Sequence, residues 1–269
     1  MRSHDRRPAA ADRPSPSGTR PSATGARLAA AGARLVAADL RLVGRDPLLC
    51  VMPFVPFLAA VALRLILPPL AAFIAKATGF ELLGYAALIR AVLILFPGTF
   101  FGMMSGFLLL DDRDDGVSAY WSVSPVGRSG YLAARLALFS AAALIAGLAV
   151  GPAFGLGGGA FALDAGVAVV GALQAPFFAL FLAAFASDKV EGLATLKALS
   201  ALDLAPLAVL LPLPARALAW PFPQYWAAEL ALGPGTGSAV RPLAALGLGL
   251  AASAAWLAFL YARYRRRVD

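Results

Sequence analysis

The stretch that decides the fold is LLLDDRDDGVSAYWSVSPVGRSGYLAARL, residues 108–136. It begins at the end of one long apolar stretch, 85–110, and runs into the start of another, 130–150. A bilayer core of ~30 Å requires roughly 20 apolar residues in a helix, and both stretches meet that length. The polar, acidic segment between them therefore predicts a connection outside the membrane that joins two spans.

Four further apolar stretches of this kind occur in the chain. The predicted transmembrane helices are 48–67, 85–110, 130–150, 161–186, 199–219 and 241–262. Hydrophobic residues make up 60% of the 269 residues and charged residues only 14%, which excludes an ordinary soluble domain. The predicted fold class is therefore all-α: a polytopic membrane protein with six transmembrane helices.

The residues before the first span divide into two parts. Residues 1–26 are rich in Pro, Ser, Arg and Ala, so we expect a disordered cytoplasmic tail. In residues 27–46, three arginines recur at a spacing of seven beside Leu and Val: Arg27, Arg34 and Arg41. This pattern is typical of a helix in the membrane interface, with its arginines toward anionic lipid headgroups. The predicted domains are the tail and one membrane domain, 27–269.

The positive charges predict the orientation. Seventeen Lys and Arg lie in the N-terminal segment and the connections on its side of the membrane, and five lie on the other side or in the helix ends there. Cytoplasmic segments carry the excess of Lys and Arg. We therefore expect both termini in the cytoplasm and a multi-pass protein of a bacterial-type inner or plasma membrane. The net charge of +8 then reflects topology, and we expect no nucleic-acid partner.

The sequence lacks the residues that disulfide formation, metal binding, catalysis and ATP hydrolysis require. Cys50 is the only cysteine and His4 the only histidine, so an internal disulfide and a cysteine-based metal site are excluded. The sequence contains no GxxxxGK[ST], HExxH or GxSxG motif. We therefore predict no catalytic residue, no metal and no cofactor, and a chain that does not hydrolyse ATP by itself.

The acidic connection has two interpretations. Its carboxylates surround Arg113 and precede Gly116: Asp111, Asp112, Asp114 and Asp115. In the first interpretation they form a solvated turn that ends the span. In the second they begin a short cytoplasmic helix, since carboxylates are favourable at a helix N-terminus, and Tyr120 and Trp121 are anchors for a partner protein.

Three segments, in this order, resemble type-2 ABC transporter permeases, in particular the branch that exports drugs and hydrophobic compounds. The first contains Asp112 to Gly116, Ser124-Pro125, Tyr131-Leu132 and Arg135. The second is SDKVEGLATLK at 187–197, with Lys189 to Gly192 and Lys197. The third is the proline-rich segment before the last span, with Pro212, Pro214, Pro221, Pro223, Tyr225 and Trp226. The likeness covers roughly residues 35–265.

The resemblance implies a non-catalytic permease subunit of an ATP-driven exporter for a hydrophobic or amphipathic compound. It implies a separate cytoplasmic ATPase subunit and a second permease subunit, in a homodimer or heterodimer within the lipid bilayer. The helix before the first span would be an interfacial elbow. The acidic connection would be a coupling helix whose contact residues are Asp112, Asp114, Asp115, Gly116, Tyr120 and Trp121.

Three polar residues within the spans are candidates for the pathway or a gate: Arg64, Arg90 and Gln174. For the arginines we favour snorkelling from helix ends over a gate, because an arginine facing lipid at mid-bilayer costs ~2.5–3.5 kcal/mol. Gln174 is more often an interhelical contact than a ligand. We expect Asp164 to cap a helix at the outer side, and the deep parts of the spans to hold almost no ionisable group.

Two other functions remain open from the sequence. One is an ion-coupled secondary transporter, which would hold ionisable groups near the middle of the membrane. The other is a non-transporting immunity or assembly protein, which would explain the hydrophobicity but not the acidic connection. A neighbouring gene for an ATPase would favour the exporter.

Overall fold

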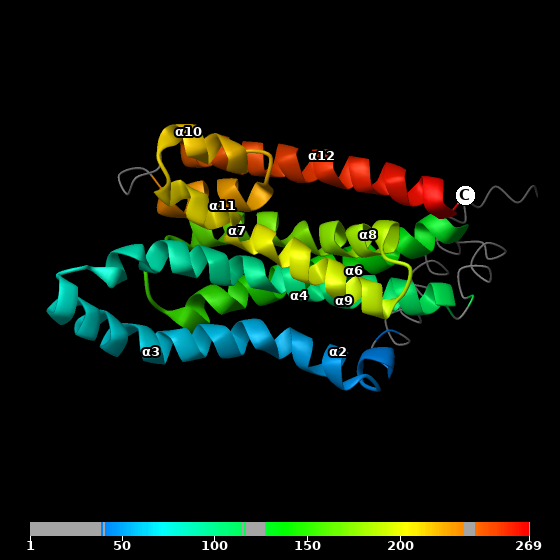
Figure 1. The fold of residues 1–269 in the computed structure, drawn as a ribbon, viewed down its shortest axis with the longest axis horizontal. Helices are drawn as coiled ribbons and strands as arrows, with labels where there is room; N and C mark the ends of the chain where they lie inside the picture. The colour runs from blue at the N-terminus through cyan, green and yellow to red at the C-terminus, as the bar shows by residue number, and fades with distance from the viewer. Residues whose placement is uncertain (1–38, 40, 115, 117–126, 234–239, 269) are drawn as a thin grey trace, which may run out of the picture.

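The computed structural model describes residues 39, 41–114, 116, 127–233 and 240–268, and the regular elements in these ranges are helices. Six helical segments are long and apolar enough to cross a membrane. In Figure 1 they run along the long axis of the molecule, with α3 (Val55–Thr78) at one edge and α12 (Pro242–Val268) at the other. The prediction of an all-α protein with six spans is confirmed. The tail and most of the expected interfacial helix lie outside the described residues.

The bundle has two ends. We call basal the end that carries α2 (Pro47–Val51), the last residues of α4 (Ala86–Asp114) and the C-terminal part of α12. The opposite, distal end carries the connection from α3 to η2 (Leu82–Tyr85) and the short helix α10 (Leu213–Arg216). The predicted coupling connection starts and ends at the basal end (Figure 1).

The first span consists of α2, η1 (Met52–Phe54) and α3. Its start follows from Asp46, whose carboxylate accepts hydrogen bonds from the Leu48 and Leu49 amides at 2.9 and 3.4 Å. The predicted span ended at residue 67, but α3 continues through Pro68 and Pro69 to Thr78. Membrane helices tolerate proline because nearby groups satisfy the freed carbonyls. Gly79, with φ of 73°, ends the helix in the left-handed conformation.

The second and fourth spans form the centre of the bundle. The fourth consists of α7 (Phe161–Ala172) and α8 (Gln174–Phe185), which are interrupted at Leu173. Pro176 has no N–H to bond the carbonyl of residue 172, which explains why α7 ends there. Glycines of α4 allow close contact with this span: a Cβ added at Gly98 would lie 2.0 Å from the Gly171 carbonyl oxygen. Small residues permit such approach between membrane helices.

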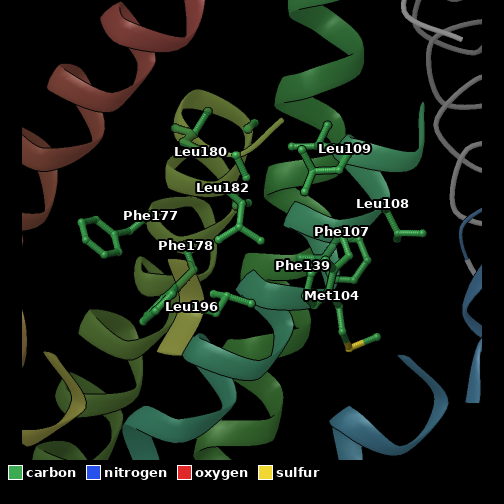
Figure 2. Close-up of a cluster of buried hydrophobic side chains, with 14 of the residues drawn as sticks. Met104, Phe107, Leu108, Leu109, Phe139, Phe177, Phe178, Leu180, Leu182 and Leu196 are labelled. Carbon is green, nitrogen blue, oxygen red and sulfur yellow. The ribbon is translucent and has the colours of Figure 1, made fainter. Parts of the chain in front are cut away.

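A cluster of buried apolar side chains fills the basal half of the bundle. Figure 2 shows side chains from α4, α6 (Gly127–Phe154) and α8 directed toward one another, with Phe107, Phe178 and Leu182 among them. These three are at most 2% exposed. The cluster therefore holds the ends of the second, third and fourth spans together next to the coupling connection.

The outer faces of the peripheral spans remain apolar and exposed. Leu65 and Phe73 of α3 are 68% and 70% exposed, and Ile145 of α6 is 69% exposed. In water such a surface would be unfavourable, because burial contributes about 25 cal/mol for each Å² of apolar area. Contact with lipid or with another subunit removes this cost, as expected of a membrane protein.

The fifth span lies earlier in the chain than we predicted. Residues 187–197 were expected to be a polar connection, but α9 (Lys189–Leu199) and η3 (Ser200–Leu210) form the span together. Asp188 accepts a hydrogen bond from the Glu191 amide at 2.8 Å, and Glu191 accepts one from the Ser187 amide at 2.6 Å. This reciprocal capping starts the helix at Lys189, ahead of the apolar part.

The proline-rich segment before the last span is partly buried within the protein between residues 220 and 233. Residues 211–222 form the distal turn with α10 and η4 (Ala217–Ala219), and α11 (Pro223–Leu232) then packs against α4, α7, α12 and η3. Two of its aromatic residues bond locally through their polar groups: the Tyr225 hydroxyl donates to Glu229 at 2.7 Å, and the Trp226 indole donates to the Trp220 carbonyl at 2.8 Å. With these groups satisfied, the aromatic rings can be buried.

Candidate functional site: a charged joint at the basal end

Arg135 of α6 is the centre of a buried charged cluster. Its side chain is 1% exposed and forms ion pairs with Asp39 and Asp112. The guanidinium Nε lies 3.1 Å from the Asp39 carboxylate, and the guanidinium carbon lies 4.8 Å from the centre of the Tyr131 ring. The Tyr131 hydroxyl donates a hydrogen bond to Asp112. We call Asp39, Asp112, Tyr131 and Arg135 the basal joint.

Local structure explains how three segments supply these side chains. Tyr131 and Arg135 are four residues apart on α6 and therefore share a face. Asp112 lies in the last turn of α4, and Asp39 precedes the first span. The joint thus connects the segment before the first span to both helices that flank the coupling connection. Loss of one partner from a buried ion pair costs about 3–5 kcal/mol, because the other charge is then left buried without a partner.

A second, more exposed contact connects the turn between α8 and α9 to the same end. The Lys189 ammonium lies 2.9 Å from Asp111 and 3.4 Å from Asp46. Arg113 donates to the Ala186 carbonyl at 3.4 Å. Burial acts to raise the pKa of Asp46, but the Leu48 and Leu49 amides and Lys189 together lower that pKa below its ordinary value. Ion pairs this exposed contribute little, so this contact supplements the joint.

The predicted coupling residues separate into different environments. Asp112 is buried in the joint, whereas Asp114, the last residue of α4, is exposed. Gly116 has φ of 68°, a left-handed conformation that glycine adopts without strain. Asp115, Tyr120 and Trp121 lie outside the described residues. Of the three predicted coupling residues that the structure describes, only Asp112 belongs to a charged cluster.

The two arginines that were candidates for the pathway or a gate lie at the distal end and contact the last residues of the third span or those just after it. Arg64 donates to the Ala153 carbonyl at 3.3 Å from an exposed position, and Arg90 donates to the Leu156 carbonyl at 3.2 Å. Arg90 also forms an ion pair with Asp164, and each of the two side chains is only 11% exposed. Asp164 is this partner and not the expected helix cap.

Gln174 lies at the middle of the bundle, at the break between α7 and α8, and is 2% exposed. Its Oε1 lies 3.3 Å from the Thr99 hydroxyl of α4, and that hydroxyl lies 2.9 Å from an Asp203 carboxylate oxygen of η3. The predicted interhelical role fits this contact. The expectation of almost no deep ionisable group overlooked Asp203, although an acid within SALDLAPLAVL was a visible signal.

Asp39 and the full role of Arg135 were also missed by sequence reasoning. Asp39 lies among the arginines of the expected interfacial helix, where an acid looks solvated. Arg135 follows Tyr131 by one helical turn at the start of a span, and this spacing was a usable signal for a buried cation. Its partners could not be identified, because Asp39 is 96 residues away in the chain.

Comparison with known proteins identifies the family. Residues 39–261 match the family described as Fluoroquinolones export permease protein Rv2686c-like. Two similar proteins are the fluoroquinolones export permease proteins Rv2686c of Mycobacterium tuberculosis (strain ATCC 25618 / H37Rv) and MT2760 of strain CDC 1551 / Oshkosh. Each is 30% identical over 162 residues, which cover 59% of this chain and 64% of the relative, just under two thirds of its length. Because the family match spans most of the sequence, the chain belongs to the Rv2686c-like export permease family.

Proposed function

We propose that this chain is the membrane-spanning subunit of an ATP-driven exporter of hydrophobic or amphipathic compounds, with fluoroquinolones as the first candidates. Membership of an export permease family and six apolar spans support transport. The observation that supports coupling to an ATPase is the basal joint. It connects both helices that flank the acidic connection to the segment before the first span.

In this proposal the basal end is cytoplasmic, and a separate ATPase binds the connection between α4 and α6. A partner that pushes on this connection moves the last turn of α4 and the first turn of α6. Arg135 then transmits the displacement to the segment before the first span, because its ion pairs are buried and resist separation. Two copies of the permease, with Asp114, Asp115, Gly116, Tyr120 and Trp121 toward the ATPase, complete the exporter.

The test is drug accumulation in bacteria that express the chain with a candidate ABC ATPase. We expect less fluoroquinolone in these cells than in cells with the ATPase alone. A variant of the ATPase that lacks its phosphate-loop lysine is the control and should abolish the difference. Equal accumulation in all three strains, with the permease present in the membrane, would contradict the proposed function.

A pull-down tests the coupling residues. Truncation of a central interface anchor often costs 2 kcal/mol or more, so Trp121→Ala should weaken ATPase binding roughly 30-fold. Asp114→Ala should have a smaller effect, because an exposed charge contributes little. Wild-type binding and export by Trp121→Ala would mean that the connection is a solvated turn.

Asp203 gives one reason to retain the ion-coupled alternative, since secondary transporters hold ionisable groups at this depth. The two functions differ in their energy source. Export that continues after a protonophore collapses the proton gradient, while ATP remains available, favours the ATP-driven exporter. Export that stops under these conditions favours the secondary transporter.

A further inference from the structure

Two buried amide groups near the break in the fourth span each have an atom without a partner. Gln174 begins α8 and Gln224 lies in the first turn of α11, and each residue is 2% exposed. The Gln174 Oε1 contacts Thr99, but within the described part of the chain the Gln174 Nε2 and the Gln224 Oε1 have no hydrogen-bond partner. Buried polar groups are usually bonded to protein or to ordered water. These two atoms therefore indicate a bound ligand.

Both glutamines line the same small chamber, which lies between α8, α11 and α12. Six of the residues that line it are Gln174, Phe177, Phe222, Gln224, Ser253 and Trp256. The chamber leaves about 10 Å³ for the centre of a water-sized molecule. One bound water requires roughly 10–15 Å³, whereas sites for drug-sized ligands range over roughly 300–1,000 Å³. The chamber is thus the size of a single water site.

The polar atoms of the chamber select a neutral ligand that both donates and accepts hydrogen bonds. The Gln174 amide nitrogen is a donor, and the Gln224 amide oxygen is an acceptor. The Ser253 hydroxyl donates to the Gly249 carbonyl at 2.8 Å, so its oxygen can accept a further hydrogen bond. A cation would face the N–H group of Gln174, and an anion would face the oxygen of Gln224. A water molecule can accept one bond here and donate two, and buried waters typically form about three.

Aromatic side chains form much of the chamber wall. The Trp256 indole donates a hydrogen bond to the Pro221 carbonyl at 2.9 Å, which holds the ring in place. The centre of this ring lies 5.8 Å from that of Phe177 and 6.3 Å from that of Phe222. In such apolar surroundings a hydrogen bond is stronger than in bulk water, and an unpaired amide atom is correspondingly costly.

We infer that the chamber binds one water molecule, which bridges Gln174, Gln224 and Ser253. The water connects the break in the fourth span to α11 and to the last span. Through Gln174 it also continues the polar contacts that Thr99 makes with Gln174 and Asp203. Ordered waters are one means by which polar groups are satisfied at breaks in membrane helices. The inference goes beyond the proposed function and does not depend on it.

X-ray footprinting of the full chain in phosphatidylcholine nanodiscs tests the inference. A pulse of X-rays converts bound water into hydroxyl radicals, which oxidise adjacent side chains, and mass spectrometry locates the products. Phe177 lines the chamber, whereas its neighbour in the sequence, Phe178, is 0% exposed and lies outside the chamber. We expect oxidation of Phe177 and almost none of Phe178.

Gln224→Leu is the variant that removes the water, because leucine is close to glutamine in size but has no acceptor. It should reduce the oxidation of Phe177 to the level of Phe178. Ser105→Ala is the matched control. The Ser105 hydroxyl on α4 is also buried without a partner in the part of the chain that the structure describes, but it does not line the chamber. Its loss should leave the oxidation of Phe177 unchanged.

Thermal unfolding of the same two variants gives a second readout. If water pairs with Gln224, then Gln224→Leu removes a bonded group, and the unfolding temperature should fall by roughly 2–6 °C. Ser105→Ala removes a buried polar atom that has no partner, so its unfolding temperature should equal or exceed that of wild type. The two substitutions should therefore act in different directions.

The inference is overturned if Phe177 of wild type is oxidised no more than Phe178. This comparison requires no variant, so it decides the matter even where Gln224→Leu does not fold. Two further results also contradict the bound water: oxidation of Phe177 in folded Gln224→Leu at the wild-type level, or a Gln224→Leu protein at least as stable as wild type.

Discussion

At the residue scale, Arg135 is the position where one substitution should have the largest effect. Arg135→Ala leaves Asp39 and Asp112 buried without their cation, so we expect a loss of about 3–5 kcal/mol of folding stability. Arg135→Lys keeps the charge but not the planar fork that contacts both carboxylates, and should lose less. The measurement is the thermal unfolding of the purified protein, monitored by its tryptophan fluorescence.

The matched control for this prediction is Arg41→Ala, which removes an exposed arginine near the same end. Its unfolding temperature should equal that of wild type. In Asp112→Asn, the Tyr131 hydroxyl keeps an acceptor but Arg135 loses a charge partner, so an intermediate loss is expected. An Arg135→Ala protein as stable as wild type would show that the joint contributes no stability.

At the element scale, the crossing of α4 with the fourth span depends on glycine. A Cβ at Gly98 would lie 2.0 Å from a backbone oxygen, and one at Gly102 would lie 2.8 Å from the Ala175 carbonyl oxygen. Backbone atoms cannot rotate away, so Gly98→Ala and Gly102→Val must separate the helices. Overpacking typically costs about 1–3 kcal/mol, and these two changes should reach or exceed that range.

Gly247→Ala is the control at this scale, because a Cβ at that position in α12 meets no atom within 4 Å. Alanine is favoured over glycine in a helix by up to about 1 kcal/mol, so this variant should be as stable as wild type or more stable. The measurement is the fraction of monodisperse protein after heating, by size-exclusion chromatography. Equal heat resistance of Gly98→Ala and Gly247→Ala would argue against the close crossing.

At the scale of the whole molecule, the orientation of the bundle can be tested. Cys50 is free and exposed, so it is first replaced by serine. Single cysteines at Ser22, Gly158 and Gly235 are then treated with a membrane-impermeant maleimide in intact cells. The excess of positive charge on the N-terminal side predicts that only positions 158 and 235 react. Reaction at position 22 in intact cells would reverse the proposed orientation.

The sequence by itself determined the class of the protein, its six spans and, through its motifs, its family. Span number depends on the length and composition of continuous stretches, which are local properties. The residues at which the spans begin and end were less well determined. The capping of α9 by Asp188 and the continuation of α3 past Pro68 depend on a few polar or proline residues, whose effect changes with their surroundings.

Only the tertiary structure decided which polar residues meet. Arg135 pairs with Asp39, Arg90 pairs with Asp164, and Thr99 contacts Asp203, over separations of 96, 74 and 104 residues. Each contact depends on which faces of the spans pack together. In a chain that is 60% hydrophobic, nearly all faces are apolar and give little information about their neighbours. The burial of α11 was undetermined for the same reason, because aromatic residues suit both a membrane interface and a helix core.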